Sequence, residues 1–154
     1  AGANDTRFAM VISNCSGCCG AAISRRAIGE NFARIDTSFP HWFTREFDKY
    51  KNKEANFPAD QHWLAALAAP RPLYIASATE DLWADPKGEW LAAVHAAPVY
   101  ALFGKKGVKA NFPAPECPDF SETVAYHLRT GKHDITAYDW QQYIHFAQRI
   151  YQPK

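Results

Sequence analysis

The sequence predicts an α/β fold built on a mostly parallel sheet. Three apolar runs of strand length, at 7–13, 72–78 and 121–128, alternate with segments of helical spacing. Alternating strands and helices are typical of a parallel sheet whose faces are covered by helices, a three-layer sandwich. Three strands are few for a complete domain of this class, so we expect residues 1–154 to be the C-terminal part of a single domain.

The composition argues against two kinds of partner. The formal charge is +1, and basic and acidic residues are interspersed without a Lys/Arg cluster. Nucleic-acid-binding surfaces usually show such clusters, so we expect no nucleic-acid partner. No stretch approaches the roughly 18 apolar residues of a membrane span, so we expect no membrane partner either.

The first strand is expected at 7–13, where a continuous apolar run suits a strand buried on both faces of a sheet. A loop rich in Gly, Cys and Ser follows it. Segment 32–57 is aromatic and charged, contains a proline and has little periodicity. We expect it to be a long excursion over the carboxyl edge of the sheet, where functional loops gather.

Helices are expected on either side of the second strand. The first covers 58–69 and ends at a pair of prolines. The second begins with Asp85 as N-cap and Pro86 in the first helical position, and runs to about His95. A Gly/Pro-rich loop at 103–120 leads to the third strand, and the last helix covers 136–151, with a threonine that suits its N-cap.

An acid and a histidine each follow a predicted strand. Asp81 comes shortly after 72–78, and His133 stands in a Gly-containing loop after 121–128. In α/β-hydrolases the catalytic triad runs Ser, Asp/Glu, His along the chain, so this order fits its second half. No Gly-x-Ser-x-Gly motif occurs, and we expect the nucleophile to lie upstream of residue 1. Glu80 and Asp85 remain alternatives for the acid.

The four cysteines do not predict a metal site. Three of them cluster at 15–19, and only Cys117 remains elsewhere. A zinc site would need a second ligand pair at matching spacing, so we expect no metal. A disulfide from Cys18 or Cys19 to Cys117 and buried free thiols are equally compatible with the sequence.

Eight short motifs occur in order along the whole chain, and together they resemble the glucuronoyl esterases, a carbohydrate esterase family with the α/β-hydrolase fold. The motifs are AGANDTRFAMVIS (1–13), SGCCGAA (16–22), SRRAIGE (24–30), PHWF (40–43), DQH (60–62), APRPL (69–73), EDLWADPKGE (80–89) and GKHDIT (131–136). The resemblance implies a serine esterase that hydrolyses the ester between 4-O-methyl-glucuronic acid of glucuronoxylan and lignin alcohols through an acyl-enzyme. It also implies no cofactor, a secreted or periplasmic location, and a nucleophile elbow just upstream of this chain.

The resemblance assigns roles to particular residues. His133 matches the catalytic base, and Asp81 matches one of the family's two positions for the acid. The other position, a Glu in many members, is Cys15 here, and a neutral thiol cannot take that role. Trp83 matches a tryptophan that contacts the uronate ring, and Glu30 matches a carboxylate that binds sugar hydroxyls.

Each binding residue also has a structural reading. Trp83 could be a core residue, and Glu30 could be a surface charge. Trp42 could line the side of the alcohol, or it could pack in the core. Two other functions remain open for the chain as a whole: another esterase activity such as acetyl-xylan esterase, and a non-catalytic carbohydrate-binding relative, which the cysteine at position 15 makes plausible.

Overall fold

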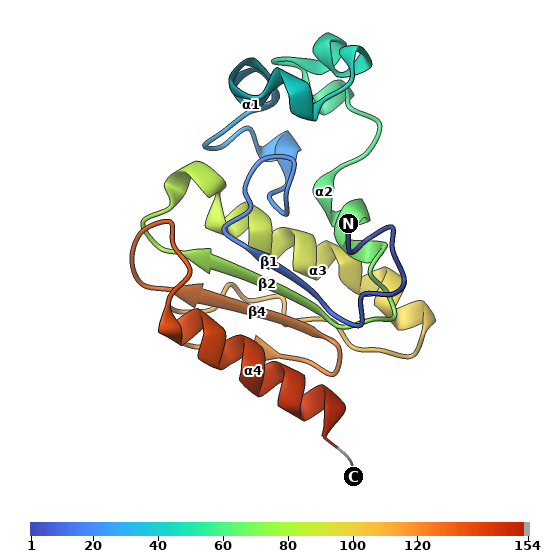
Figure 1. Cartoon of the computed structure of the whole chain (residues 1–154), viewed down its shortest axis with the longest axis vertical. Helices are drawn as coiled ribbons and strands as arrows, with labels where there is room; N and C mark the ends of the chain where they lie inside the picture. Colours follow the sequence, from blue (N-terminus) through green and yellow to red (C-terminus); the bar gives the residue numbers. More distant parts are fainter. Residues whose placement is uncertain (153–154) are drawn as a thin grey trace.

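The computed structural model describes residues 1–152, and it contains a four-stranded sheet with helices on both faces (Figure 1). The strands are β1 (Val11–Asn14), β2 (Leu73–Ala78), β3 (Asp119–Phe120) and β4 (Val124–Arg129). Their order is β1-β2-β4-β3; β1, β2 and β4 are parallel, and β3 is antiparallel to β4. The predicted α/β fold with a mostly parallel sheet is confirmed.

The strands differ in burial. Every residue of β2 and β4 is buried, as expected for strands covered on both faces. In the part of the sheet that residues 1–152 form, β1 lies at the edge and its Ile12 is 42% exposed, so the predicted burial of the first strand on both faces is not observed there. The strand is also shorter than 7–13, because Arg7 folds back onto Asp5 in a turn that precedes it.

Two hydrophobic clusters hold the layers together. α2 (Gln61–Ala66) and α3 (Pro86–Leu102) lie on one side, and α4 (Ala137–Tyr151) lies on the other (Figure 1). Successive residues of a strand point to opposite faces, so Ile75 packs towards α3 while Tyr74 packs towards α4. Within residues 1–152, no helix has the length and apolarity that crossing a bilayer requires.

Some predicted boundaries are wrong. α3 continues seven residues beyond the expected end at His95, with Pro98 inside the helix. Ala96 and Tyr100 are fully buried, so packing against the sheet offsets the hydrogen bond that a proline loses. α2 is shorter than 58–69, because the side chain of Asp60 caps its first turn.

The last strand and last helix lie close to their predicted places. The expected strand 121–128 is β4, and the expected loop 103–120 contains β3 at its end. The predicted cap of α4 is confirmed: Thr136 and Asp139 exchange backbone and side-chain hydrogen bonds in a capping box.

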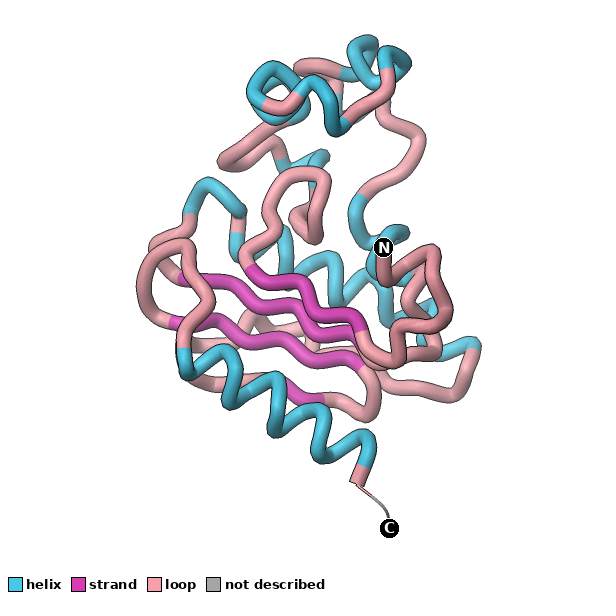
Figure 2. The backbone as a smooth tube through the Cα atoms, viewed as in Figure 1, coloured by secondary structure: helices cyan, strands magenta, loops and turns pink. Residues whose placement is uncertain are grey.

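Segment 32–57 has more structure than expected. It contains α1 (Phe32–Ser38), capped by the side chain of Asn31, and several short 3₁₀ segments. Figure 2 shows it as short helical pieces joined by loops, set apart from the sheet. It has an aromatic cluster of its own, formed by Phe32, Phe43, Phe47, Tyr50 and Phe57.

Candidate active site

Asp81 and His133 meet at the carboxyl ends of two neighbouring strands. β2 and β4 are parallel, so the loops that follow them leave the same edge of the sheet. The Nδ1 atom of His133 lies 2.7 Å from Oδ2 of Asp81. The Asp81 side chain is 6% exposed and that of His133 is 70% exposed. The buried carboxylate thus accepts a hydrogen bond from Nδ1 of the exposed ring, which leaves the Nε2 atom free to face the cleft.

Backbone hydrogen bonds fix the two loops to each other. The N–H of Thr79 donates to the carbonyl of Arg129 at 2.8 Å, and the N–H of Glu80 donates to that of Gly131 at 2.8 Å. The N–H of Gly131 in turn donates to Oγ1 of Thr79 at 3.1 Å. The pairing of β2 with β4 therefore continues past both strands, almost to the acid and the histidine.

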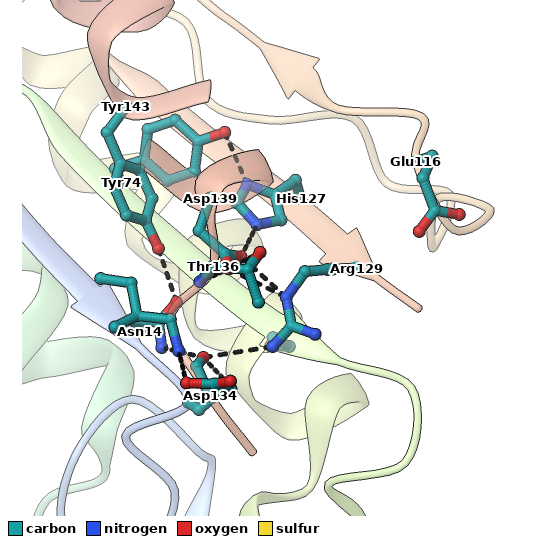
Figure 3. Close-up of polar contacts among 12 residues, drawn as sticks. Asn14, Tyr74, Glu116, His127, Arg129, Asp134, Thr136, Asp139 and Tyr143 are labelled. Carbon is teal, nitrogen blue, oxygen red and sulfur yellow. Dashed lines mark hydrogen bonds and ion pairs between the residues drawn. The ribbon is translucent and has the colours of Figure 1, made fainter. Parts of the chain in front are cut away.

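Arg129 anchors the loop that carries His133 (Figure 3). It is the last residue of β4 and is 6% exposed. Its Nε atom donates to both carboxylate oxygens of Asp139, at 3.1 and 2.9 Å. Its remaining donors reach the carbonyl oxygens of Thr130, Lys132 and Asp134. One buried guanidinium therefore holds the backbone on both sides of His133.

His127 contacts the same carboxylate, Asp139, that holds Arg129 in place beneath this loop. It is fully buried, with Nδ1 at 2.8 Å from the hydroxyl of Tyr74 and Nε2 at 2.8 Å from Oδ1 of Asp139 (Figure 3). Burial lowers the pKa of His127, while Asp139 acts in the opposite direction. It is therefore a packed residue of the sheet.

The other candidates for the acid do not contact His133. Glu80 is exposed, and no hydrogen bond joins its side chain to residues 1–152. Asp85 accepts from Arg26, at 2.6 and 3.2 Å. As predicted, Asp85 is the N-cap residue of α3 and Pro86 takes the first helical position, but the carboxylate turns to Arg26 and makes no capping hydrogen bond.

Cys15 lies beside the acid–histidine pair. It is 5% exposed, and its Sγ atom is 4.0 Å from the carbonyl oxygen of Asp134. Burial raises the pKa of the Cys15 thiol to about 12, with the negative charges of Glu89 and Asp81 acting in the same direction. The thiol is therefore neutral near pH 7 and cannot stabilise an imidazolium.

A cleft of about 190 Å³ contains all five residues predicted for the site. Its walls are formed by Cys15, Ser16, Gly17, Cys18, Glu30, Ile35, Phe39, Trp42, Asp81, Trp83, Ala84 and His133. They come from the loops after β1, β2 and β4 and from segment 32–57. Segment 32–57 thus supplies one wall of the cleft.

Trp83 and Glu30 form a connected pair in this cleft. The N–H of Glu30 donates to the carbonyl of Trp83 at 2.9 Å. Burial raises the pKa of the Glu30 carboxyl, against the opposing effects of the nearby Trp83 side chain and of the Arg34 charge. Trp83 is 50% exposed, with the Arg34 guanidinium 5.7 Å from its ring centre. The reading of Trp83 as a core residue is wrong.

Trp42 is also exposed rather than packed in the core. Its ring stacks on that of Phe39, with 4.2 Å between the ring centroids and 11° between their planes. The side chain is 60% exposed, so the pair presents a flat apolar surface at the cleft.

Sequence reasoning assigned no role to Glu89, which lies below the loop after β1. It is fully buried in the first turn of α3 and accepts hydrogen bonds from Ser16, Gly17 and Ser77 at 2.6–3.2 Å. Burial raises the pKa of Glu89 to about 7 in spite of these donors. Its helical spacing from Ala92, Ala93 and Ala96 is the sequence signal that places it on the buried face.

The cysteines are reduced. All four are free within residues 1–152, so the alternative of a disulfide to Cys117 is wrong. Cys15 and Cys18 are buried, whereas Cys117 is exposed. The Sγ atoms of Cys18 and Cys19 lie 3.9 Å apart. Cys15, Asp81 and His133 could hold a metal ion, because one ligand atom from each lies within 4.8 Å of the other two.

The chain is similar to known carbohydrate esterases. The family model described as "Glucuronyl esterase, fungi" matches residues 1–104. A carbohydrate esterase from an unknown prokaryotic organism is 59% identical over 148 residues, which are 96% of this chain and 34% of that protein. A 4-O-methyl-glucuronoyl methylesterase from Thermothelomyces thermophilus is 35% identical over 145 residues, covering 82% of this chain and 36% of that protein.

A solved structure shares the fold of this chain. The glucuronoyl esterase from Solibacter usitatus superposes with a TM-score of 0.92 at 51% identity, covering 98% of this chain and 38% of that one. The chain thus spans about a third of the length of the relatives that it matches, between 34% and 38%.

Proposed function

The chain belongs to the glucuronoyl esterase family, and we propose that it supplies the acid and the base of a carboxylic ester hydrolase. The observation that carries this proposal is the 2.7 Å contact between His133 and Asp81 at the edge of a cleft. A histidine held by a buried carboxylate is the proton-transfer pair of a hydrolytic triad. We propose that the nucleophile is a serine in a part of the protein upstream of residue 1.

The proposed reaction proceeds in two acyl-transfer steps. Nε2 of His133 takes the proton of the serine hydroxyl as its oxygen attacks the ester carbonyl, and Asp81 stabilises the imidazolium that forms. The imidazolium then gives its proton to the departing alcohol, leaving an acyl-enzyme. In the second step His133 deprotonates a water molecule, which releases the acid and regenerates the serine. The reaction requires no metal or organic cofactor.

The proposed substrate is an ester of 4-O-methyl-glucuronic acid, as in the link between glucuronoxylan and lignin alcohols. The name of the Thermothelomyces thermophilus relative supports this class. Trp83 offers an aromatic face with an N–H donor to the uronate ring, and Glu30 offers a carboxylate to its hydroxyls. The stacked pair of Phe39 and Trp42 suits an apolar alcohol. Because this substrate belongs to plant cell walls, we expect the protein to be secreted or periplasmic.

The test compares two esters with protein that includes the upstream segment. We expect benzyl glucuronate to be hydrolysed faster than p-nitrophenyl acetate, and the activity to be lost in His133→Ala. His145→Ala is the matched control, since His145 is an exposed residue of α4 outside the cleft. A preference for acetyl esters would favour an acetyl-xylan type of esterase, and saccharide binding without turnover would favour the non-catalytic alternative.

A further inference from the structure

The thiol of Cys15 has no role in the proposed reaction, although it lies beside the groups that would carry it out. Its N–H donates to the carbonyl of Ala76 at 2.8 Å, so pairing with β2 fixes the place where β1 ends. Its φ of 45° lies in the left-handed region, which turns the chain sharply at this point. The fold therefore holds a thiol at a defined position in the wall of the cleft.

Three potential metal ligands converge here from the loops that follow the neighbouring strands β1, β2 and β4. Cys15 Sγ, a carboxylate oxygen of Asp81 and a ring nitrogen of His133 all lie within 4.8 Å of one another. Thiolate, carboxylate and imidazole are the ligand types that zinc takes in proteins. The set opens to the cleft, which leaves a fourth position for water or another small ligand.

We propose that Cys15, Asp81 and His133 form a binding site for a thiophilic divalent cation, and that a bound ion blocks the acid–base pair. Ligand atoms of a tetrahedral zinc site lie roughly 3.3–3.8 Å apart, given metal–ligand distances of about 2.0–2.3 Å. The separations of up to 4.8 Å exceed this by about 1 Å. A shift of the His133 ring by about that amount would bring the three ligand atoms into range of one ion.

The charges around Cys15 favour a cation. The carboxylates of Glu89 and Asp81 both act on the thiol, and Arg129 is the cation that opposes them. A divalent ion replaces the thiol proton, which passes to water as the metal–sulfur bond forms. A thiolate ligand selects zinc or cadmium over magnesium and calcium, which prefer oxygen ligands.

The occupied site would be inhibitory. The Nδ1 atom of His133 and the carboxylate of Asp81 now hydrogen-bond to each other. When both ligate a metal, His133 can no longer exchange a proton with substrate, and its orientation is set by the ion. The same cluster thus has two incompatible states, one with the acid–base pair and one with the metal.

A cadmium titration tests the site without depending on catalysis. Protein that includes the upstream segment is titrated with Cd²⁺ while the ultraviolet absorption of the thiolate–cadmium bond is followed. We expect one ion per chain, reversed by EDTA, and binding weakened at least roughly 10–100-fold in Cys15→Ser, since even groups behind a ligand have effects of that size. His133→Ala should also weaken binding, although it keeps the thiol.

The neighbouring thiols provide the matched control. Cys18 and Cys19 lie outside the three-ligand cluster, so the double variant Cys18→Ser/Cys19→Ser should bind cadmium as tightly as the unaltered protein. Equal affinity in Cys15→Ser and the unaltered protein would overturn the proposal. The proposal would also be overturned if the thiolate–cadmium absorption were lost only in the double variant, or if cadmium binding did not saturate.

Zinc inhibition tests the second half of the proposal. Each variant is compared with its own rate without metal, so differences in basal activity cancel. We expect the zinc concentration for half inhibition to rise at least about tenfold in Cys15→Ser. Equal inhibition in both proteins contradicts the blocking role. Failure of the proposed esterase activity leaves the cadmium result unaffected.

Discussion

Nδ1 of His133 and Oδ2 of Asp81 are 2.7 Å apart, although 52 residues separate them along the chain. The two residues follow adjacent parallel strands whose pairing continues into both loops. Their contact is therefore a consequence of sheet register, and it connects an exposed ring to a buried charge.

The first prediction concerns Asp81. Asp81→Asn should lower kcat by about 10⁴-fold, because an amide stabilises neither the required tautomer nor the imidazolium. The adjacent exposed carboxylate gives the control, and Glu80→Gln should retain nearly full activity. A loss of similar size in Glu80→Gln would assign the acid to that residue instead.

The second prediction concerns the position of Cys15. The double variant Cys15→Glu/Asp81→Asn removes the carboxylate at position 81 and places one at position 15, which is the family's other position for the acid. A charge-assisted hydrogen bond contributes about 1.5–3 kcal/mol, so we expect roughly 10–100-fold more activity than in Asp81→Asn alone. Cys15→Gln/Asp81→Asn has a similar shape without the charge and should show no such recovery. Equal rates in the two double variants would refute electrostatic rescue.

The third prediction concerns Arg129 and stability. Arg129→Met removes one partner of a buried ion pair and leaves Asp139 without its guanidinium, which typically costs about 3–5 kcal/mol. Urea unfolding measures the change in the free energy of unfolding. Lys132→Met removes an exposed positive charge from the same loop and should change it little. A small effect of Arg129→Met would mean that other contacts hold the loop.

The fourth prediction is a pH dependence of stability from Glu89. Burial raises its pKa in the folded protein from 4.5 to about 7. Between these values the folded state binds more protons than the unfolded state, so its contribution to the free energy of unfolding falls as pH rises. The total fall is about 3 kcal/mol, at 1.36 kcal/mol per pKa unit.

Glu89→Gln supplies the control for this pH dependence, because the amide does not titrate. We expect urea unfolding of the unaltered protein to show a loss of stability between pH 4.5 and 7, and this component to be absent in the variant. If the difference in the free energy of unfolding between the two proteins stays constant from pH 4.5 to 7, the raised pKa of Glu89 is contradicted.

The fifth prediction distinguishes the contributions of Trp83 and Trp42 to substrate binding. Trp83→Phe removes an N–H donor and should raise KM for benzyl glucuronate roughly two- to tenfold, since a net hydrogen bond contributes about 0.5–1.5 kcal/mol. Trp42→Ala should instead reduce the preference for aromatic over methyl alcohols. Trp63→Ala is the control, because Trp63 is exposed on α2 outside this cleft. An equal rise in KM in the control would exclude a specific contact.

The sequence predicts the layers and the meeting of Asp81 with His133 because both depend on local signals. Apolar runs identified β2 and β4, and the residues placed just beyond them are the ones that meet. The sequence did not predict that Pro98 lies within α3, because the burial of Ala96 and Tyr100 depends on a sheet assembled from distant segments.

The support of the site was harder to predict. Arg129 holds three carbonyl groups of the following loop, and such backbone contacts leave no pattern in the sequence. Glu89 has a weak signal, its spacing on the apolar face of α3, but its donors come from separate loops. Charged residues that are buried to position others are recognised only when the three-dimensional neighbours are known.

The aromatic cluster of segment 32–57 has a consequence for how specificity could diverge. That segment forms one wall of the cleft, yet its rings pack mainly on one another, and Lys51 pairs with Asp36 inside the same segment. The acid and the histidine are fixed separately, by the strands and by Arg129. The wall can therefore be replaced as a unit: insertions or exchanges there can reshape one side of the cleft while the contact between Asp81 and His133 is kept.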